Sequence, residues 1–251
     1  MKTLNNYILE RLNPRNLGSV DLDTLSEELK EKYRLVFNPT TGRYDCNNSI
    51  AIKNDLIDDR GHFICNFGVI KGFFDCRDCK NLTSLKGAPK KVGETFYCSG
   101  LSDLTSLEGA PKEVGWSFYC YSCPELETLE GSPKKVGMSF DCSECQKLTS
   151  LEGASEEIGI DFFCNDCNKL ESLEGAPKEV GRFFDCTGCK SLTSLKGAPE
   201  KVGKDFNCSG CENLTSLEGA PEEVGGRFYC KDCPKLTDYN INAKIGGKLI
   251  K

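Results

Sequence analysis

The sequence predicts a repeat solenoid built on parallel β-strands, and a single repeating block carries most of this prediction. A block of 22 residues, typified by Phe-Asp-Cys-x-x-Cys-x-x-Leu-Thr-Ser-Leu-x-Gly-Ala-Pro-x-x-Val-Gly, recurs along most of the chain. Its first cysteine falls, without any insertion, at Cys76, Cys98, Cys120, Cys142, Cys164, Cys186, Cys208 and Cys230. A fixed period of this size indicates that each block is one turn, which buries its apolar face by stacking on its neighbours.

Each block is expected to contain a short strand around Phe-x-Cys, with alternate residues such as Phe74 and Cys76 pointing inward. Leu82 and Leu85 should turn inward beyond the strand. The Gly-Ala-Pro segment predicts a bend, followed by a brief helical or extended crossing that returns to the next strand. The charged residues of this crossing, such as Lys91 and Glu157, should form a solvated outer face.

The residues ahead of the repeats predict a small amino-terminal unit over residues 1–49. Apolar spacing over residues 4–12 indicates an amphipathic helix that stops before Pro14. A second helix should start at Thr24, where Glu27 completes a capping box, and end near Tyr33, with Leu22, Leu25 and Leu29 on its buried side. The segments 35–37 and 43–46 flank a stretch with proline and glycine, so they predict a hairpin.

The two ends of the repeat array depart from its internal pattern, as terminal turns of a solenoid must in order to hide the open core. Residues 50–71 predict a capping turn, in which Ile50-Ala51-Ile52 has the strand alternation without its cysteines. The regular repeats span 72–235. Residues 236–251 should form a second cap, closed by a strand near Leu249.

Composition restricts the classes of partner. The 251 residues carry a formal net charge of -6, and the pI is near 5.1, which argues against nucleic acid because its binders display a clustered basic face. No run of 18 apolar residues and no apolar signal core occurs, so neither membrane insertion nor export is expected. Seventeen cysteines at repeat spacing, without a leader, fit a reducing cytoplasm better than a disulfide scaffold.

The block resembles the leucine-rich repeats, in particular the short repeats of bacterial and phage proteins. Phe-x-Cys-x-x-Cys-x-x-Leu matches their frame over residues 50–250, and Leu-Thr-Ser-Leu-x-Gly-Ala-Pro is similar to the short bacterial form. Many such repeats carry Asn where Cys79 and its equivalents stand here. The resemblance implies a curved solenoid with a parallel sheet on its concave side, convex crossings outside it, and a role in protein binding.

The repeated Cys-x-x-Cys pairs raise the alternative of a metal-binding or thiol-redox protein, because two thiolates at this spacing can hold two corners of a tetrahedral site. Both cysteines occupy positions that the repeat points into its core, where free cysteine packs as a small apolar residue. Leu101 replaces the second cysteine of one block, and the only histidine is His62. We therefore predict structural thiols and no cofactor.

No set of residues indicates an enzyme. A cysteine–histidine pair would need His62, which lies outside the regular repeats, and no glycine-rich phosphate loop is present. Function is therefore expected in the outward positions that vary from block to block. These candidate binding residues are Phe73, Asp75, Tyr97, Trp116, Tyr119, Tyr121, Asp141, Phe163, Phe183, Asp185, Asn207 and Tyr229.

Aromatic anchors interleaved with carboxylates predict an interface for a protein with a basic surface. The expected function is that of a protein-interaction module. The resemblance to bacterial and phage repeats implies, more specifically, a phage-encoded modulator or inhibitor of a bacterial host or defence factor. A purely structural role for the aromatic residues, as cross-strand shielding of the sheet, is the competing interpretation. Self-association through the helix over residues 4–12 is a further alternative, and the sequence leaves the oligomeric state open.

Overall fold

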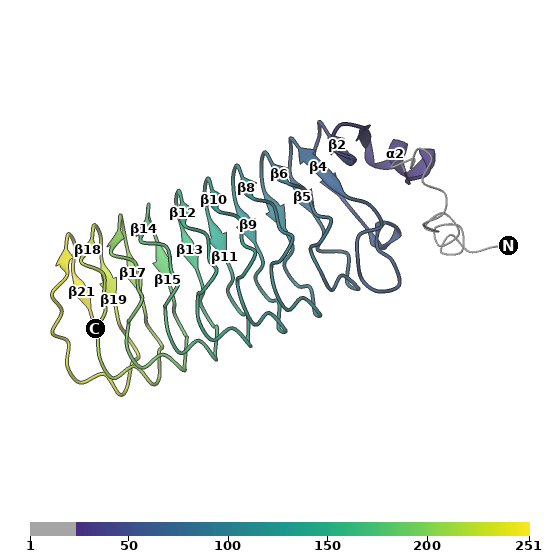
Figure 1. Cartoon of the computed structure of the whole chain (residues 1–251). Coiled ribbons are helices and arrows are strands. Elements are labelled where there is room, and N and C mark those ends of the chain that lie inside the picture. The colour runs from purple at the N-terminus through teal and green to yellow at the C-terminus, as the bar shows by residue number, and fades with distance from the viewer. Residues whose placement is uncertain (1–23) are drawn as a thin grey trace.

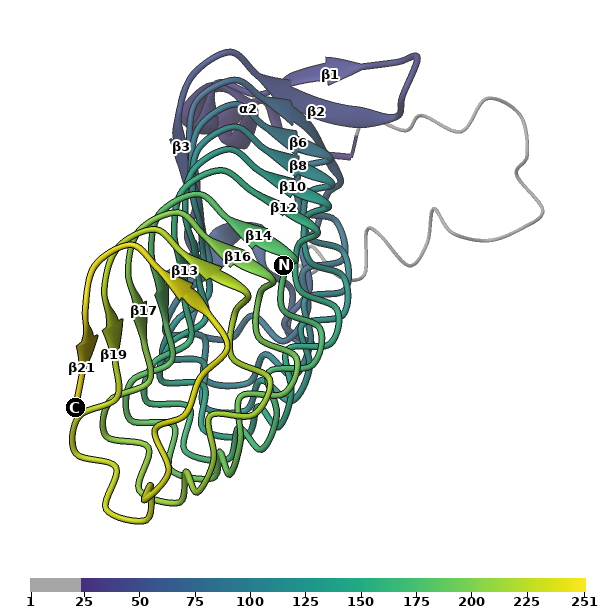
Figure 2. The same ribbon diagram turned by 90° about the vertical axis from the view of Figure 1, so that its left-hand side faces the viewer.

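The protein folds into a stack of similar turns that runs from an amino-terminal cap to the last strand of the chain (Figure 1). The structure is a computed structural model, and it describes residues 24–251. The helix expected over residues 4–12, and Leu22, lie outside the described residues. Each turn contributes one strand to each of two parallel sheets, which form two sides of a flattened coil while loops complete the turn (Figure 2). The predicted repeat solenoid is confirmed.

Sheet A contains 11 strands, of which β1 and β2 form the antiparallel hairpin expected near the amino terminus. Its strands, in spatial order, are β1 (Val36–Asn38), β2 (Arg43–Cys46), β4 (Phe67–Ile70), β6 (Lys91–Val92), β8 (Glu113–Val114), β10 (Lys135–Val136), β12 (Glu157–Ile158), β14 (Glu179–Val180), β16 (Lys201–Val202), β18 (Glu223–Val224) and β20 (Lys244–Ile245). From β2 onward every pair is parallel. The crossings of the repeat are therefore extended rather than helical.

Sheet B contains 10 strands and is formed by the Phe-x-Cys segments. Its strands, from the amino-terminal end, are β3 (Ile50–Ala51), β5 (Phe74–Asp75), β7 (Phe96–Tyr97), β9 (Phe118–Tyr119), β11 (Phe140–Asp141), β13 (Phe162–Phe163), β15 (Phe184–Asp185), β17 (Phe206–Asn207), β19 (Phe228–Tyr229) and β21 (Leu249–Ile250). Equivalent residues of successive turns pair directly, as Phe140 does with Phe162. The final strand expected near Leu249 is present and pairs with β19.

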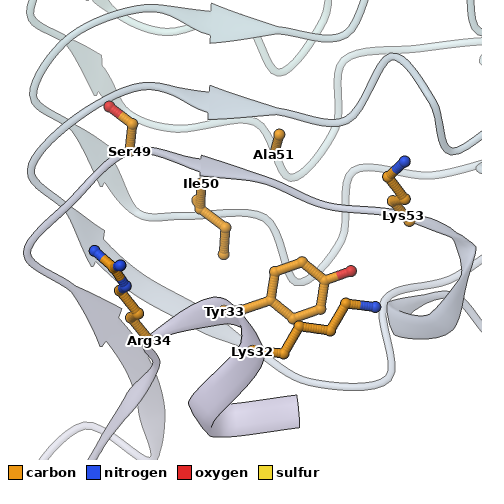
Figure 3. Close-up of a pocket in the computed structure, with 7 residues that line it drawn as sticks. All are labelled: Lys32, Tyr33, Arg34, Ser49, Ile50, Ala51 and Lys53. Atoms are coloured by element: carbon orange, nitrogen blue, oxygen red, sulfur yellow. The ribbon is translucent and has the colours of Figure 1, made fainter.

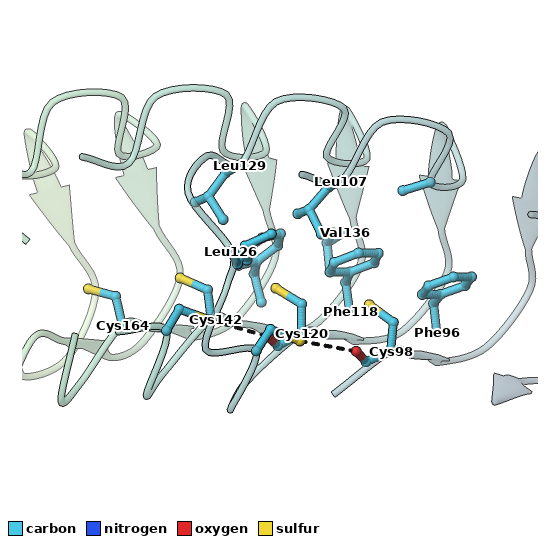
Figure 4. Close-up of a cluster of buried hydrophobic side chains, with 14 of the residues drawn as sticks. Phe96, Cys98, Leu107, Phe118, Cys120, Leu126, Leu129, Val136, Cys142 and Cys164 are labelled. Carbon is cyan, nitrogen blue, oxygen red and sulfur yellow. Dashed lines mark hydrogen bonds between the residues drawn. The ribbon is translucent and has the colours of Figure 1, made fainter. Parts of the chain in front are cut away.

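The core between the sheets consists of columns of identical side chains. Phenylalanine rings stack from Phe74 in β5 to Phe228 in β19, with ring centroids 4.9–5.4 Å apart and planes 3–29° from parallel. Valine or isoleucine from sheet A and the two leucines of each block fill the opposite side (Figure 4). Parallel in-register pairing places like residues side by side, so a repeated sequence produces these columns directly.

Glycine is required at the corner where each turn leaves sheet A. A Cβ atom at Gly115 would lie 1.9 Å from the carbonyl oxygen of Gly93 in the preceding turn, and one at Gly137 equally close to that of Gly115. Any side chain here would force neighbouring turns apart. The Val-Gly pair at the end of each block therefore sets the close spacing of the stack.

The amino-terminal end of the core is covered by helix α2 (Glu27–Tyr33) and the hairpin. Ser26, not Thr24, is the N-cap: its Oγ accepts a hydrogen bond from the Leu29 amide at 3.3 Å. Thr24 instead donates its amide to the hydroxyl of Tyr44 at 2.8 Å, because Tyr44 extends from the hairpin beneath the helix. The helix ends at Tyr33, as predicted. A 3-10 turn, η1 (Asn54–Leu56), follows β3.

The charged residues of the crossings are exposed, as expected, but they are also paired between turns. Lysine and glutamate lie 22 residues apart in pairs such as Lys91–Glu113 at 2.7 Å and Lys135–Glu157 at 2.9 Å. Exposed pairs of this kind add little stability. Because each pair joins opposite charges on neighbouring turns, these residues favour the native register of turns.

Candidate binding surface

Sheet B presents one column of variable residues on its outward side, and we call this side the sheet-B face. Each member stands between an inward phenylalanine and an inward cysteine, both fully buried. The column consists of Asp75, Tyr97, Tyr119, Asp141, Phe163, Asp185, Asn207 and Tyr229, and all are half-buried. Strands about 4.8 Å apart bring neighbouring members into contact, so each covers part of the next.

Four of the predicted residues come together near the amino-terminal end, and we call them the first aromatic cluster: Phe73, Tyr97, Tyr119 and Tyr121. The rings of Tyr97 and Tyr119 stack with centroids 5.5 Å apart. Phe73 meets Tyr97 edge-on at 6.1 Å, and Tyr121 meets Tyr119 edge-on at 6.3 Å. The phenol groups give this patch polar edges around an apolar centre, which is the character of interface anchors.

Arg77, which the sequence analysis did not single out, binds at the edge of the first aromatic cluster. Its Nε and Nη2 donate to the two carboxylate oxygens of Asp75 at 3.0 and 2.6 Å. Its guanidinium also lies over the ring of Tyr97, 4.4 Å from the centroid. The hydrogen bonds that Arg77 donates to Asp75 raise the pKa of Arg77 above its ordinary value. The negative charge of Asp75 is thus already balanced by Arg77 within the chain.

Five other predicted residues surround a shallow hollow of about 150 Å³ nearer the carboxyl-terminal end. The hollow is lined by Phe163, Phe183, Phe184, Asp185, Asp205, Asn207 and Tyr229. Asp205, which sequence reasoning missed, directly precedes β17 and its inward phenylalanine. The guanidinium of Arg182 lies over the Phe183 ring, 4.8 Å from its centroid. Rings and carboxylates therefore alternate around one depression.

The Asp and Asn members of the column also have a structural task. The Oδ1 atoms of Asp141, Asp185 and Asn207 each accept a hydrogen bond from the amide two residues later, at 2.9, 2.8 and 3.1 Å. These bonds close a turn at the end of each strand, which is a common use of Asp and Asn. Burial raises the pKa of Asp141, against hydrogen bonds from Ser143 that lower it.

Trp116 lies apart from both groups of rings. It precedes β9 by two residues, at the corner between the sheets, and half of its surface is exposed. The amide of Met138 in the next turn donates to its carbonyl oxygen at 2.8 Å, and Ile160 follows in the same way. Trp116, Met138 and Ile160 therefore form an apolar strip. The sequence could have revealed it, since all three directly follow the glycine that ends the Val-Gly or Ile-Gly pair of successive blocks.

A larger hollow of about 290 Å³ lies at the junction between the amino-terminal cap and the first turn (Figure 3). It is lined by Lys32, Tyr33, Arg34, Ser49, Ile50, Ala51 and Lys53. The hydroxyl of Tyr33 donates to Oδ1 of Asp55 at 2.6 Å, and Lys32 pairs with the other oxygen of Asp55. Burial raises the pKa of Tyr33 to about 12. These contacts fasten helix α2 to the loop after β3.

All 17 cysteines are free and buried, as the sequence predicts for structural thiols. The second cysteine of a block donates its Sγ–H to the carbonyl oxygen of the first cysteine in the preceding turn, as Cys123 does to Cys98 at 3.4 Å and Cys145 to Cys120 at 3.4 Å (Figure 4). The second-column cysteines Cys167, Cys189, Cys211 and Cys233 make the same bond. The thiols thus link turns along the core.

The position of Leu101 supports this reading of the second cysteine column. Leucine has no hydrogen to offer to the Cys76 carbonyl, which instead accepts the amide of Cys79 at 3.0 Å. Leu101 itself is fully buried in the column. Within residues 24–251, no group of three or more His, Cys, Asp or Glu side chains is arranged to hold a metal ion.

Burial raises the pKa of most thiols, including Cys76, Cys98 and Cys120, because the interior disfavours a thiolate. Reactive cysteines need the opposite, a lowered pKa and access to solvent.

In the part of the chain that the structure describes, no helix has the length and apolar character needed to cross a bilayer. No protein family, curated protein or solved structure matched the chain.

Proposed function

We propose that this chain is a protein-interaction module that binds a protein partner through the sheet-B face. The observation that supports this most directly is the grouping of half-exposed rings and carboxylates on that face, while the same strands keep an invariant apolar side in the core. A solenoid turn needs only the inward residues in order to stack. The outward aromatic residues are therefore free to serve recognition.

The chemical character of the face favours a basic partner surface. Asp141, Asp161, Asp185 and Asp205 lie on or beside strands β11 to β17, whereas the lysines of the repeats lie mostly on the crossings and outer loops. Opposite charge steers partners together and suppresses wrong ones. Tyrosine and phenylalanine supply the apolar contact area that carries most binding energy in interfaces.

The proposal is of a binding role without catalysis, in a reducing cytoplasm. Support for the compartment comes from the 17 cysteines at repeat spacing in the core, since disulfide scaffolds are typical of small secreted domains. The resemblance of the repeats to those of bacterial and phage proteins supports a phage-encoded modulator of a bacterial factor as the more specific form of the proposal. The burial of the thiols weighs against the metal or redox alternative.

Affinity capture from a bacterial lysate, with the tagged full-length chain as bait, tests the proposal. The variant Tyr97→Ser/Tyr119→Ser should lose the captured protein, because it removes the stacked centre of the first aromatic cluster. The matched control Lys135→Ser/Lys201→Ser changes two exposed residues of sheet A and should retain it. Both variants should unfold at the same urea concentration as the unaltered chain within error.

Two outcomes would contradict the proposal. Equal capture by both variants would exclude the first aromatic cluster as the binding surface. Loss of cooperative unfolding in Tyr97→Ser/Tyr119→Ser would show that the rings shield the sheet instead, as the structural interpretation of this column holds. Light scattering of the unaltered chain separates partner binding from self-assembly, because a module of this kind should remain at one fixed mass over a range of concentrations.

A further inference from the structure

At one place on the sheet-B face a guanidinium contacts both an aspartate of one turn and a ring of the next turn. Asp75 and Tyr97 are directly paired across β5 and β7. Arg77 hydrogen-bonds both oxygens of Asp75 and stacks on Tyr97. A carboxylate on one turn and a ring at the paired position of the next therefore make a complete seat for a planar cation.

The same pair of residue types recurs three blocks later without its arginine. Asp141 and Phe163 are paired across β11 and β13 in the same register as Asp75 and Tyr97. The residue equivalent to Arg77 is Ser143, whose Oγ donates to Asn165 at 2.6 Å. Among residues 24–251 no ring stacks on Phe163, and no cationic group lies over it. The seat is present and its internal occupant is not.

A second carboxylate flanks the ring on its other side. Asp185 pairs with Phe163 across β13 and β15, so a carboxylate stands on each neighbouring strand. Asp185 uses Oδ1 for the turn to Thr187, and its Oδ2 has no hydrogen-bond partner within the described chain. The hollow formed with Phe183 and Asp205 opens beside it and gives a side chain room to enter.

The electrostatics of the seat favour a cation from outside the chain. Asp141 is half-buried, and burial together with the nearby Glu144 and Asp185 raises its pKa. A carboxylate in this situation lacks a positive neighbour, whereas Asp75 has one in Arg77. A guanidinium over Phe163 would supply the missing charge and restore the arrangement seen at the first aromatic cluster.

We propose that Asp141, Phe163 and Asp185 form a recognition site for one arginine side chain of a protein partner. The guanidinium stacks on the Phe163 ring and hydrogen-bonds to a flanking carboxylate. Arginine is favoured over lysine because a planar fork both stacks and binds a carboxylate through two bonds, as Arg77 does. The identity of the partner rests on the proposed function, but the chemistry of the site is testable without it.

The test uses N-acetyl-arginine amide as the probe and the folded full-length chain with isotope-labelled phenylalanine. The Phe163 resonances, assigned by comparison with Phe163→Leu, should shift and saturate as the probe is added at low salt. N-acetyl-citrulline amide has nearly the same shape without the charge and should cause no saturable shift. Asp141→Asn combined with Asp185→Asn should weaken binding at least about tenfold. Asp232→Asn, an exposed position in the last regular block, is the matched control and should leave binding unchanged.

A gain-of-occupancy variant gives an independent result. Ser143→Arg places in this block the arginine that Arg77 provides in the first one, so it should abolish the probe-induced shift of Phe163 while the chain still unfolds cooperatively. Equal shifts from the arginine and citrulline probes, or undiminished probe binding to Ser143→Arg, would overturn the proposal. Failure to capture any partner, with probe binding intact, would count against the proposed function alone. A captured partner that ignores Asp141→Asn/Asp185→Asn but is lost from Tyr97→Ser/Tyr119→Ser would refute a role for this site in partner binding.

Discussion

Raising the pH from 8 to 9.5 should strongly destabilise this protein, because burial favours the protonated thiols in the folded state. Burial raises the pKa of fourteen of the 17 thiols above the ordinary value. In the unfolded chain each thiol has a pKa of about 8.5. Above that pH the unfolded chain holds fewer protons, so the free energy of unfolding falls as the pH rises.

The upper limit of this effect is as large as the whole stability of an ordinary domain. A thiol that is neutral when folded and titrates near 8.5 when unfolded lowers the free energy of unfolding by about 1.2 kcal/mol between pH 8 and 9.5. Fourteen such groups set an upper limit of about 17 kcal/mol. Typical domains are stable by about 5–15 kcal/mol. Lysine and tyrosine titrate mainly above this window, so the thiols dominate it.

Urea unfolding followed by far-ultraviolet circular dichroism, in a phosphine reductant, measures the free energy of unfolding at each pH. The thiolate absorbance near 240 nm should appear together with the loss of ellipticity, and both should reverse when the pH returns to 8. Cys145→Leu is the matched variant, because Leu101 shows that the column accepts leucine. With one buried thiol fewer, its loss between pH 8 and 9.5 should be smaller by about 1.2 kcal/mol.

Two results would refute this reasoning. Stability that stays constant up to pH 9.5 would mean that the thiols ionise equally in both states, and so are not buried in an apolar core. Thiolate absorbance at pH 9 with unchanged ellipticity would show ionised thiols inside the folded stack, which is the state that a metal or redox site requires.

Three further predictions concern the stacking of turns. Phe140→Ala should lower the free energy of unfolding by about 3–5 kcal/mol in urea titrations, since this fully buried ring stacks on neighbours at 5.3 and 5.4 Å. Phe140→Leu should lower it clearly less, and equal effects of the two substitutions would contradict a role for ring packing. Gly115→Ala should destabilise more than Gly100→Ala, because a Cβ meets the Gly93 carbonyl at 1.9 Å in the first case and open space in the second. Alanine at Gly100 costs only the backbone strain of a φ of +71°, about 1–2 kcal/mol, and melting temperatures of the pair decide this. Ellman's reagent at pH 8 should react with none of the thiols in the native chain within minutes and with all 17 in denaturant, and rapid native reaction would place thiols at the surface.

The repeat period by itself determined the solenoid, its inward columns and the burial of the cysteines. Phe74, Cys76, Leu82 and Leu85 have equivalents in the regular blocks, and a side chain that recurs at a fixed period in stacked turns lies against its own copies. The departure at Leu101 was enough to favour packing over chemistry for the second cysteine. The hairpin was also predictable, because proline and glycine act locally on the backbone. The N-cap of helix α2 was not: Thr24 was expected, but Ser26 caps the helix because Thr24 is held by the hydroxyl of Tyr44.

Only the tertiary structure decided what the crossings are and which outward residues meet. A two-residue strand such as Lys91–Val92 has too little pattern to indicate a sheet, and its pairing depends on turns 22 residues away. The same holds for the ion pair of Asp75 with Arg77, for the separation of Trp116 from the other rings, and for the ring of Phe163 left between two carboxylates. Sequence spacing fixes the column in which a residue stands, but neighbours in space come from different turns, and side-chain contacts between them arise only when the turns are stacked.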